Sequence, residues 1–465
     1  MVAKSESTLT FHGGAGAVTG ANFLLEIAPS SATDRPIRLL VDCGLYQGGK
    51  VFENRNNESF PYDPATIDYL FVTHAHLDHV GRIPKLVHQG FRGVIYSTLP
   101  TKKIAALILE DSLGLMGKEA RGSGQPLLYD LADVAAALAR WQTLEYRSPL
   151  TLGNSEVTVT SRDAGHILGS AMYEVTRGDR RLLFTGDLGN SPSPLLHDTE
   201  VVKGVNYLVM ESVYGDREHG GAATRRDQLE DVIENTMRAD GVLLIPAFSI
   251  ERTQELLYEI EHMTAEGRIP PVPVYLDSPL AIQVTEIYKN SQTYFNAQVA
   301  DPDHRRDGLF NFPNLHQTLT TEESRAIVNI PGRKIIIAGS GMSNGGRIIH
   351  HEKHYLSSPT TTLLLIGYQA AGSLGRLLEE GAKEVTILGT WVLVRARILT
   401  FSGYSAHRDG PGLLDFVHQL SGSLEMVFAT MGEPKASLFL VQRIRDYLGI
   451  RAIAPRAGES AKLEL

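Results

Sequence analysis

Short apolar runs in the first half of the chain stop abruptly at polar or glycine-rich residues. Runs of this length, rich in β-branched and aromatic residues, predict buried β-strands. Three of them are followed by distinctive side chains: Tyr69–Val72 by a run of histidines, Ile37–Val41 by Asp42, and Arg181–Thr185 by Asp187. We predict two further strands at 157–160 and 171–175, with His166 in the glycine-containing segment between them. Side chains that follow strands in this way can enter a site without competing with core packing.

A glycine-rich segment near the N-terminus joins two more predicted strands within residues 8–27. No Lys-Ser/Thr helix start follows it, which argues against a phosphate-binding P-loop. We interpret the segment as a place where the backbone approaches closely beside a site.

Helical periodicity follows the histidine run. We predict a short helix at 80–89 and longer helices near 101–119 and 128–141, where apolar and charged positions alternate with helical period. Helices of this kind cover one face of a sheet.

The pattern changes in residues 215–403, where predicted strands at 242–245, 272–275, 334–337 and 363–366 alternate with helical stretches. This alternation is typical of a parallel sheet with helices on both sides. After this segment we predict an amphipathic helix, a strand at 425–429, another helix and a strand at 451–454. The sequence therefore predicts an α/β protein in which residues 215–403 are inserted into a discontinuous domain of residues 1–214 and 404–465. We expect the active site in the cleft between the two.

Composition agrees with two domains, because 465 residues exceed the size of one ordinary core. The apolar fraction of 43% and the charged fraction of 21% are those of a soluble globular protein. We find neither a bilayer-spanning run nor a signal-peptide core, and the single cysteine, Cys43, suits a reducing compartment. We therefore expect a cytoplasmic protein without a membrane partner. The formal charge of −9 argues against a general nucleic-acid coating protein but leaves a local basic groove open.

The run Thr73–His79 packs three imidazoles and a carboxylate into one short turn. Imidazole and carboxylate groups are the ligands of zinc-like ions. His74 and His76 alternate as on an extended chain, so both can reach one ion. Asp78 and His79 lie past the bend and can reach a second ion.

His166 and Asp187 follow this run in an order that suits a dinuclear site, although a lone residue of either kind is more often a cap or a core hydrogen-bonder. Asp42 has two interpretations. It either hydrogen-bonds and orients a ligand histidine, or it caps its own turn.

In this order, Asp42, the His-x-His-x-Asp-His run, His166 and Asp187 resemble the successive metal motifs of the metallo-β-lactamase fold. In that fold two β-sheets pack face to face with helices outside, as an αββα sandwich. The resemblance implies the following ligand sets: one zinc held by His74, His76 and His166, another by Asp78 and His79, and both bridged by Asp187. The fold hosts many hydrolases, so it does not select a substrate.

Later segments narrow the resemblance. Val205–Arg217 is similar to the first motif of the β-CASP nucleases, with Glu211 as its acidic residue, and Phe401–Asp409 is similar to the second, with His407. Further matches lie at Ile245–Phe248, Arg252–Leu257, Asp277–Ala281, Ala338–Met342 and Gly367–Gly375. Together these segments resemble the RNA-directed branch, related to the nuclease of mRNA 3′-end cleavage and its bacterial homologues.

This resemblance implies a zinc-dependent endoribonuclease that hydrolyses single-stranded RNA with a metal-activated water. It leaves open 5′–3′ exonuclease activity, manganese in place of zinc, and a homodimer. Two metal ions would lower the pKa of a water and hold the phosphate oxygens. Asp78 is a candidate to orient that water, and His407, oriented by Glu211, is a candidate general acid for the leaving oxygen.

Phosphate contacts are expected outside the metal motifs. Backbone N–H groups of Ser340, Gly341 and Ser343, between a predicted strand and a helix, are expected to bind a phosphate of the RNA. Arg252, and with it Arg347 and Arg376, is expected to contact the RNA backbone, although each alone is more often an ordinary solvated arginine.

One motif departs from the family pattern. RNA-directed members place a histidine ligand of the second metal before Gly-Glu, and Phe428–Pro434 carries Met431 at that position. A thioether is a poor zinc ligand, so we expect weak occupancy of the second site and reduced activity. The departure supports two alternatives: a catalytically weakened RNA-binding subunit that works through a partner nuclease, and a DNA-directed nuclease of the same family. A third, a small-molecule hydrolase, would need no inserted domain.

Overall fold

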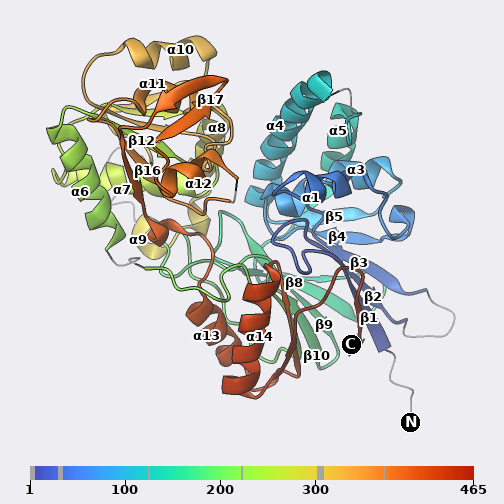
Figure 1. The fold of residues 1–465 in the computed structure, drawn as a ribbon. Helices are drawn as coiled ribbons and strands as arrows, with labels where there is room; N and C mark the ends of the chain where they lie inside the picture. Colours follow the sequence, from blue (N-terminus) through green and yellow to red (C-terminus); the bar gives the residue numbers. More distant parts are fainter. Residues whose placement is uncertain (1–5, 30–34, 124–125, 221–223, 301–307, 371) are drawn as a thin grey trace. The chain divides into compact units, whose positions relative to one another are not determined.

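The computed structural model of the chain describes residues 6–29, 35–123, 126–220, 224–300, 308–370 and 372–465. The chain divides into two compact units (Figure 1). Unit 1 comprises Met1–Glu218 and His407–Leu465, and unit 2 comprises His219–Ala406. Within the described ranges, none of the helices combines the length and apolar character that crossing a membrane requires.

The described part of unit 1 contains two seven-stranded sheets. The first has the order β22-β1-β2-β3-β4-β5-β6, and the second has the order β21-β20-β11-β10-β9-β8-β7. The first sheet is formed by β1 (Glu6–Gly13), β2 (Asn22–Ile27), β3 (Ile37–Val41), β4 (Tyr69–Phe71), β5 (Val94–Ser97), β6 (Trp141–Thr143) and β22 (Ser460–Glu464). The second is formed by β7 (Pro149–Thr151), β8 (Val157–Asp163), β9 (Ala171–Arg177), β10 (Arg180–Phe184), β11 (Tyr207–Glu211), β20 (Met426–Thr430) and β21 (Arg451–Ile453).

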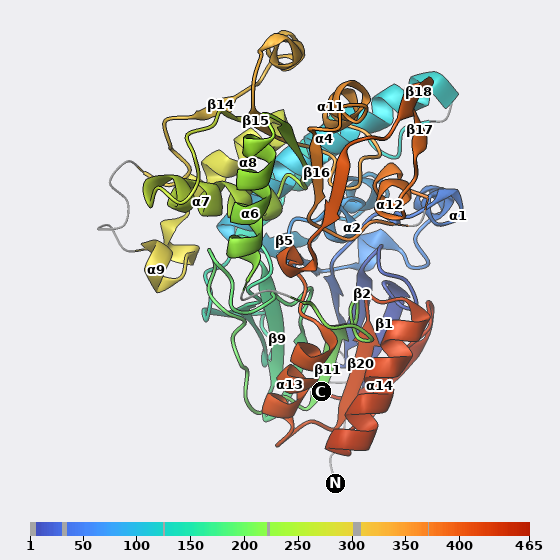
Figure 2. The ribbon, with the colours of Figure 1, turned by 60° about the vertical axis from the view of Figure 1, so that its left-hand side comes forward.

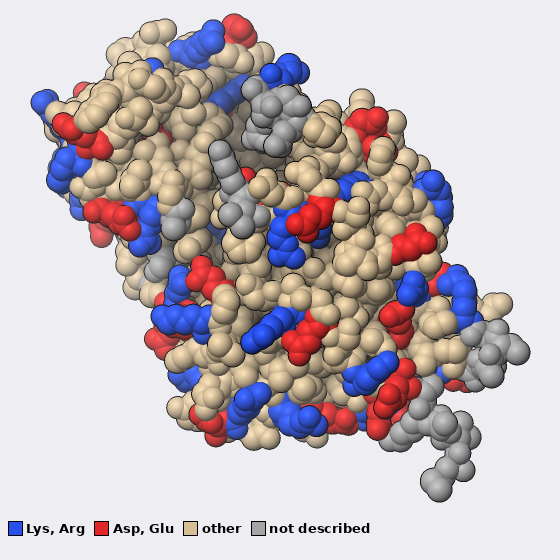
Figure 3. All heavy atoms as spheres, turned by 45° about the vertical axis from the view of Figure 1, so that its right-hand side comes forward, with Lys and Arg blue, Asp and Glu red and all other residues tan. Residues whose placement is uncertain are grey.

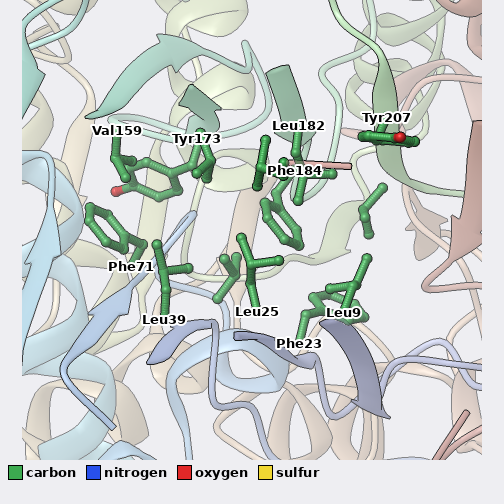
Figure 4. Packing of buried hydrophobic residues seen from close by; sticks show 14 of the residues in the cluster. Leu9, Phe23, Leu25, Leu39, Phe71, Val159, Tyr173, Leu182, Phe184 and Tyr207 are labelled. Atoms are coloured by element: carbon green, nitrogen blue, oxygen red, sulfur yellow. The ribbon is translucent and has the colours of Figure 1, made fainter. Parts of the chain in front are cut away.

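A shared apolar core joins the two sheets of unit 1. Figure 4 shows side chains of the first sheet, such as Leu25 and Leu39, facing side chains of the second, such as Leu182 and Phe184. Aromatic contacts cross the interface, because Phe71 packs edge-on against Tyr173 with ring centroids 5.1 Å apart. Each fully buried side chain of this size contributes about 1.5–3 kcal/mol, so the cluster fixes the two sheets and the loops at their ends.

Helices cover both outer faces of this sandwich. Alternate residues of the second sheet, such as Leu183 and Leu208, point away from the shared core and pack with Phe416 and Leu440. These two come from α13 (Gly410–Leu420) and α14 (Pro434–Leu448). The first sheet lies beneath α1 (Lys50–Asn54), α2 (Leu77–Val80), α3 (Ile83–His88), α4 (Leu99–Ser123) and α5 (Leu131–Ala139) (Figure 1). The predicted αββα sandwich is therefore confirmed.

Unit 2 is built on a parallel sheet with the order β14-β13-β15-β12-β16-β19. One face packs against α11, α12 and a hairpin, and α6, α7 and α8 cover the other face (Figure 2). The strands are β12 (Val242–Pro246), β13 (Val274–Asp277), β14 (Leu315–Gln317), β15 (Lys334–Ala338), β16 (Thr362–Leu365) and β19 (Arg397–Thr400), and the hairpin is β17 (Glu384–Ile387) with β18 (Thr390–Leu393). The helices are α6 (Arg225–Arg238), α7 (Arg252–Ala265), α8 (Pro279–Lys289), α9 (Ala297–Ala300), α10 (Thr321–Ala326), α11 (Ile348–Tyr355) and α12 (Leu374–Glu379). The predicted parallel α/β arrangement of the inserted segment is confirmed.

Two predicted helices of unit 1 differ from the structure in their bounds. The helix expected at 80–89 is α3, which has Pro84 in its first turn, and the shorter α2 precedes it and ends at Val80. A proline is tolerated there because its missing N–H has no intrahelical partner. The helix expected at 128–141 ends at Ala139, and Trp141–Thr143 forms the edge strand β6 instead.

Candidate metal centre

Candidate site residues lie at the carboxyl ends of neighbouring strands in both sheets of unit 1. In the second sheet, β10, β11 and β20 pair in parallel, which brings Asp187, Glu211 and Met431 to one edge. In the first sheet, β3 and β4 pair in parallel, and the N–H of Asp42 donates to the carbonyl of Phe71 at 2.9 Å. The loop Thr73–His79 begins just beyond that point.

Four side chains from three loops converge on one point. One ligand atom each of His74, His76, His166 and Asp187 lies within 4.8 Å of all the others. Nδ1 of His76 lies 3.1 Å from Nε2 of His74 and 3.2 Å from Nε2 of His166. Oδ2 of Asp187 lies 3.3 Å from Nε2 of His74 and 3.6 Å from Nε2 of His166. Three imidazole nitrogens and one carboxylate oxygen form a donor set that fits a tetrahedral zinc-like ion.

Burial keeps these imidazoles in the form that binds metals. Loss of solvent lowers the pKa of His74, and it lowers the pKa of His76 and His166 well below the usual range. The rings are therefore neutral at physiological pH, and each offers a nitrogen lone pair.

A second group of donors lies on the other side of Asp187. Oδ1 of Asp187 is 3.4 Å from Nε2 of His79, and Oδ2 of Asp78 is 3.9 Å from the same nitrogen. Nε2 of His79 and Oδ1 of Asp187 are both buried, and neither forms a hydrogen bond within the described part of the chain. Buried polar atoms without partners are costly, so their convergence fits a second cation held here. Asp187 presents one oxygen to each group, which is the geometry of a bridging carboxylate.

Asp42 contacts His79 as the first interpretation expects, and its carboxylate hydrogen bonds join it to the Thr73–His79 segment rather than to its own turn. Its Oδ2 accepts a hydrogen bond from Nδ1 of His79 at 2.7 Å, which leaves Nε2 to face Asp187. Its Oδ1 accepts from the N–H of Thr73 at 2.8 Å. The Thr73 hydroxyl donates a hydrogen bond to Asp42 and accepts one from Nδ1 of His74 at 3.0 Å. Sequence reasoning missed Thr73, and its place directly before the histidine run was the available signal.

Glu211 and His407 form a pair beside this cluster. Nδ1 of His407 lies 3.1 Å from Oε2 of Glu211 and 3.9 Å from Oδ2 of Asp187. The backbone N–H of Leu188 donates to the other Glu211 oxygen. The Glu211 carboxylate thus joins the loop that carries Asp187 to the ring of His407.

The electrostatics of this pair favour a protonated histidine. Burial opposes the charge on His407, but the carboxylates of Glu211, Asp187 and Asp78 together outweigh burial and raise the pKa of His407 to about 9. The ring therefore carries a proton at neutral pH, as a general acid requires.

Met431 packs in the apolar core of unit 1. It is 2% exposed and belongs to the cluster that joins the two sheets. Its N–H donates to the carbonyl of Gly14 at 2.6 Å, and its Sδ would lie 2.4 Å from a Cβ placed on Gly14. The glycine-rich segment thus approaches the backbone closely beside the site, and a side chain on Gly14 would displace Met431.

The predicted phosphate-binding loop of unit 2 follows β15. Ser340, Gly341 and Ser343 are brought together there, but two of the three predicted N–H donors are used within the loop. The N–H of Ser340 donates to the carbonyl of Gly345 at 3.3 Å, and the N–H of Ser343 donates to the carbonyl of Ser340 at 3.1 Å. The Ser340 hydroxyl accepts the N–H of Asn344 at 3.1 Å, and the Ser343 hydroxyl is buried and donates to Glu352. The carbonyl of Gly341 accepts from Gln369 at 3.1 Å.

Arg252 is placed differently from the expectation of an RNA contact. Its side chain is 7% exposed, and its guanidinium donates to Glu255 and to the carbonyl of Tyr404. Tyr404 donates in turn to Glu259, which also pairs with Arg225 at 3.0 Å. A guanidinium enclosed by a buried ion-pair network holds its own fold together, and a phosphate backbone could not reach it in this arrangement.

Asp277 organises a second polar network in unit 2. Its carboxylate accepts hydrogen bonds from Arg347 and His351, each at 2.7 Å, and from the hydroxyls of Thr318 and Ser324. Arg347 also donates to the carbonyls of Thr318 and Leu319, so its guanidinium is used within the fold. Arg376 differs, because its side chain is 43% exposed and pairs with Glu379 and Glu380 of its own helix region.

Comparison with known protein families covers most of the chain. The profile described as a metallo-beta-lactamase superfamily domain matches residues 32–212, and the Beta-Casp domain matches residues 253–378. The profile described as a Zn-dependent metallo-hydrolase RNA specificity domain matches residues 391–455.

Individual relatives agree with these profiles. The chain is 38% identical over 380 residues to "Ribonuclease TTHA0252" of Thermus thermophilus, covering 82% of this chain and 85% of the relative. It is 30% identical over 443 residues to "Transcription termination factor FttA" of Methanosarcina mazei, covering 92% of this chain and 68% of the relative. A crystal structure of a protein of unknown function from Enterococcus faecalis superposes with a TM-score of 0.54 at 13% identity, covering 99% of this chain and 100% of that chain, which supports the fold alone.

The sandwich and its His/Asp cluster define a metallo-β-lactamase-type metal centre. The inserted unit and the sequence relatives then indicate which family of this superfamily the chain belongs to. The chain belongs to the β-CASP family of metallo-β-lactamase proteins, a family of metal-dependent RNA nucleases.

Proposed function

We propose that this protein is a zinc-dependent ribonuclease that hydrolyses phosphodiester bonds within single-stranded RNA. One observation carries the proposal: Nδ1 of His407, hydrogen-bonded to Glu211, lies 3.9 Å from the Asp187 carboxylate, whose two oxygens face His74 and His79. A proton donor next to a site for two cations suits cleavage of a phosphodiester, which needs both charge neutralisation and a proton for the leaving oxygen.

The donor sets assign the residues that would hold the metals. His74, His76, His166 and Asp187 would hold one zinc ion, and Asp78, His79 and Asp187 would hold the other. When bound, such ions lower the pKa of a water and stabilise negative charge on phosphate oxygens.

The remaining steps belong to side chains of this chain. Asp78 would orient the attacking water, since its carboxylate lies at the edge of the second donor group. His407 would donate its proton to the leaving oxygen, and Glu211 would hold the ring in place and stabilise its charge. Thr73 and Asp42 would keep the ligand histidines in their productive orientation.

RNA is the favoured substrate for two reasons. The relative from Thermus thermophilus is named a ribonuclease, and the profile over residues 391–455 is described as an RNA specificity domain. On the face shown in Figure 3, Lys and Arg side chains are interspersed with Asp and Glu rather than forming a uniformly basic surface. We therefore propose that RNA binding is local. The Ser340 and Ser343 N–H groups already donate to carbonyls of their own loop, so of the three predicted N–H groups we propose that of Gly341 as the phosphate contact.

Met431 supports a second candidate, a catalytically weakened RNA-binding subunit. The residue offers a thioether in an apolar cluster where the family carries an imidazole. The second metal would then have only Asp78, His79 and Asp187 as protein ligands, so we propose weaker occupancy at that position.

The test is cleavage of a 5′-labelled single-stranded RNA beside a DNA of matched sequence, with zinc or manganese added. The native chain is compared with the Met431→His and His407→Ala variants. Cleavage of RNA alone, lost in His407→Ala, supports the ribonuclease. If the Met431→His form alone cleaves RNA, the low activity of the native chain is due to the missing ligand. Preferred cleavage of DNA would show that DNA, not RNA, is the substrate. Product lengths distinguish internal cleavage from trimming at the 5′ end. Zinc binding without cleavage by either form would overturn the proposal and favour the RNA-binding subunit.

A further inference from the structure

Arg408, the residue after His407, is attached to the loop that carries Asp187. Its backbone N–H donates to the carbonyl of Leu188 at 2.9 Å. Its Nε donates to the carbonyl of Gly189 at 3.1 Å, and its Nη2 donates to the hydroxyl of Ser191 at 3.1 Å. Arg408 therefore hydrogen-bonds to three residues of the Asp187 loop, namely Leu188, Gly189 and Ser191.

The same guanidinium is also connected, through Thr199, to the loop that carries His166. Nη2 of Arg408 donates to the hydroxyl of Thr199 at 3.0 Å, and that hydroxyl donates to the carbonyl of Ala164 at 2.9 Å. Ala164 lies two residues before His166. Arg408 thus links, through Thr199, the loop that carries a histidine of the first donor group.

Close packing leaves these loops little freedom to move independently. The N–H of Gly189 donates to the carbonyl of Ala164 at 2.9 Å. A Cβ on Gly189 would lie 1.9 Å from the carbonyl oxygen of Gly165 and 2.9 Å from the N–H nitrogen of His166. A displacement of the Asp187 loop would therefore be transmitted to the His166 loop.

From these contacts we propose that Arg408 is a positioning residue of the site, which holds the loops of Asp187 and His166 in register with His407. The inference rests on the proposed nuclease function for its kinetic consequence. The arginine acts through other residues, because its Nε and Nη2 donate to protein oxygens behind the metal donors.

The chemistry of the side chain explains why arginine suits this role. A planar guanidinium presents several N–H groups in fixed directions and can serve the acceptors of Gly189, Ser191 and Thr199 at once. A lysine ammonium at the same place is a point charge on a flexible stem and would satisfy fewer of them. Residues that orient metal ligands typically change metal affinity or activity by about 10- to 100-fold when they are removed.

The experiment compares Arg408→Ala and Arg408→Lys with Arg180→Ala, each in the chain as given and in the Met431→His background. Arg180 is a matched control in the same unit, since its guanidinium donates to the carbonyl of Glu464 at 2.9 Å, to Glu425 at 2.6 Å and to Tyr207 at 2.7 Å. Single-stranded RNA cleavage is measured as kcat and KM, zinc affinity by competition with a chromophoric chelator, and folding by thermal unfolding.

We expect Arg408→Ala to lower kcat by about 10- to 100-fold with little change in KM, and to weaken zinc binding by a similar factor. Guanidinium ion at concentrations far below those that denature should restore part of the lost kcat in Arg408→Ala only. Arg408→Lys should remain impaired, and Arg180→Ala should lower the unfolding temperature but keep kcat and zinc affinity.

Equal losses in Arg408→Ala and Arg180→Ala, without rescue by guanidinium, would show a role in general stability and overturn the inference. Unchanged kcat and zinc affinity in Arg408→Ala would do the same. If no form cleaves RNA, the proposed function fails, and zinc affinity alone still decides the positioning role.

Discussion

Oδ2 of Asp42 lies 2.7 Å from Nδ1 of His79 in the buried interior of unit 1, where neither side chain is exposed to solvent. Asp42 adopts a φ of 59°, a left-handed conformation that is uncommon for residues other than glycine. The chain thus holds an unfavourable backbone geometry at the point from which this carboxylate meets His79 and Thr73.

The first prediction concerns this pair. Asp42→Asn should weaken the second zinc by about 10- to 100-fold, because the amide cannot hold the His79 ring in the same charged hydrogen bond. Zinc stoichiometry after dialysis against graded chelator measures the loss. Asp133→Asn is the control, since Asp133 faces Nδ1 of His88 at 3.1 Å on the surface, where His88 is 63% exposed. Equal zinc retention in both variants would contradict the assigned role of Asp42.

The second prediction is a pH dependence set by Asp277 in unit 2. Burial opposes its ionisation, but hydrogen bonds from His351, Thr318, Ser324 and Arg347 outweigh burial and lower the pKa of Asp277 to about 2. Because the folded pKa lies below the unfolded one, the ionised carboxylate stabilises the fold above about pH 4. This contribution, about 2 kcal/mol, is lost as the pH falls toward 2.

Urea unfolding of the native chain and of Asp277→Asn, followed from pH 6 to pH 2.5, measures this contribution. The native chain should be the more stable form at pH 6, and the difference should shrink at acidic pH. A difference that stays constant across this range would rule out the ionised carboxylate as its source.

The third prediction has the opposite sign and concerns Glu352. Burial raises the pKa of Glu352 to about 8, and its Oε2 has no hydrogen-bond partner within the described residues. Since the folded pKa lies above the unfolded one, the folded state keeps a proton that the unfolded state releases, and stability falls as the pH rises from about 4.5 to 8.

Glu352→Gln cannot ionise and keeps a carbonyl to accept the hydrogen bond of Ser343. The variant should therefore gain stability relative to the native chain with rising pH, by about 4 kcal/mol between pH 5 and pH 8.5. Chemical unfolding at the two pH values tests the gain, and an equal difference at both would show that Glu352 does not titrate in this range.

The fourth prediction concerns the missing ligand. Met431→His places an imidazole in an apolar cluster, so without metal it should cost about 1–3 kcal/mol for a buried polar group without a partner. Saturating zinc should recover this loss, since a ligand at 100 times its Kd stabilises the folded state by about 2.7 kcal/mol. Met431→Leu, of similar volume, should lose little and show no additional response to zinc. Thermal unfolding with and without zinc compares the three forms, and a zinc response equal in all three would place residue 431 outside the metal centre.

Sequence reasoning singled out the residues of the candidate His/Asp cluster because each follows a recognisable apolar strand within a short motif. The loop after β4 supplies His74 and His76, helix α2 directly after it supplies His79, and parallel pairing brings the ends of neighbouring strands together. Local pattern and sheet topology therefore suffice to gather them.

Features that depend on distant contacts escaped prediction. Arg252 looked available for a phosphate, but its partners include the Tyr404 carbonyl, far away in sequence. The final strand β22 pairs with β1 across almost the whole chain, and no local pattern announced it. The strand β6 begins at Trp141, the last residue of the expected helix, because Trp141 pairs with Ile95 at the edge of the first sheet.

The division of unit 1 between two segments imposes an order on synthesis. The metal-binding histidines and Asp187 leave the ribosome before unit 2 is made, whereas His407 and the strand β20 follow only after it. A growing chain therefore holds the residues of the candidate metal cluster while it still lacks His407 and an inner strand of the second sheet. Unit 1 can complete this sheet only after the inserted unit has been synthesised.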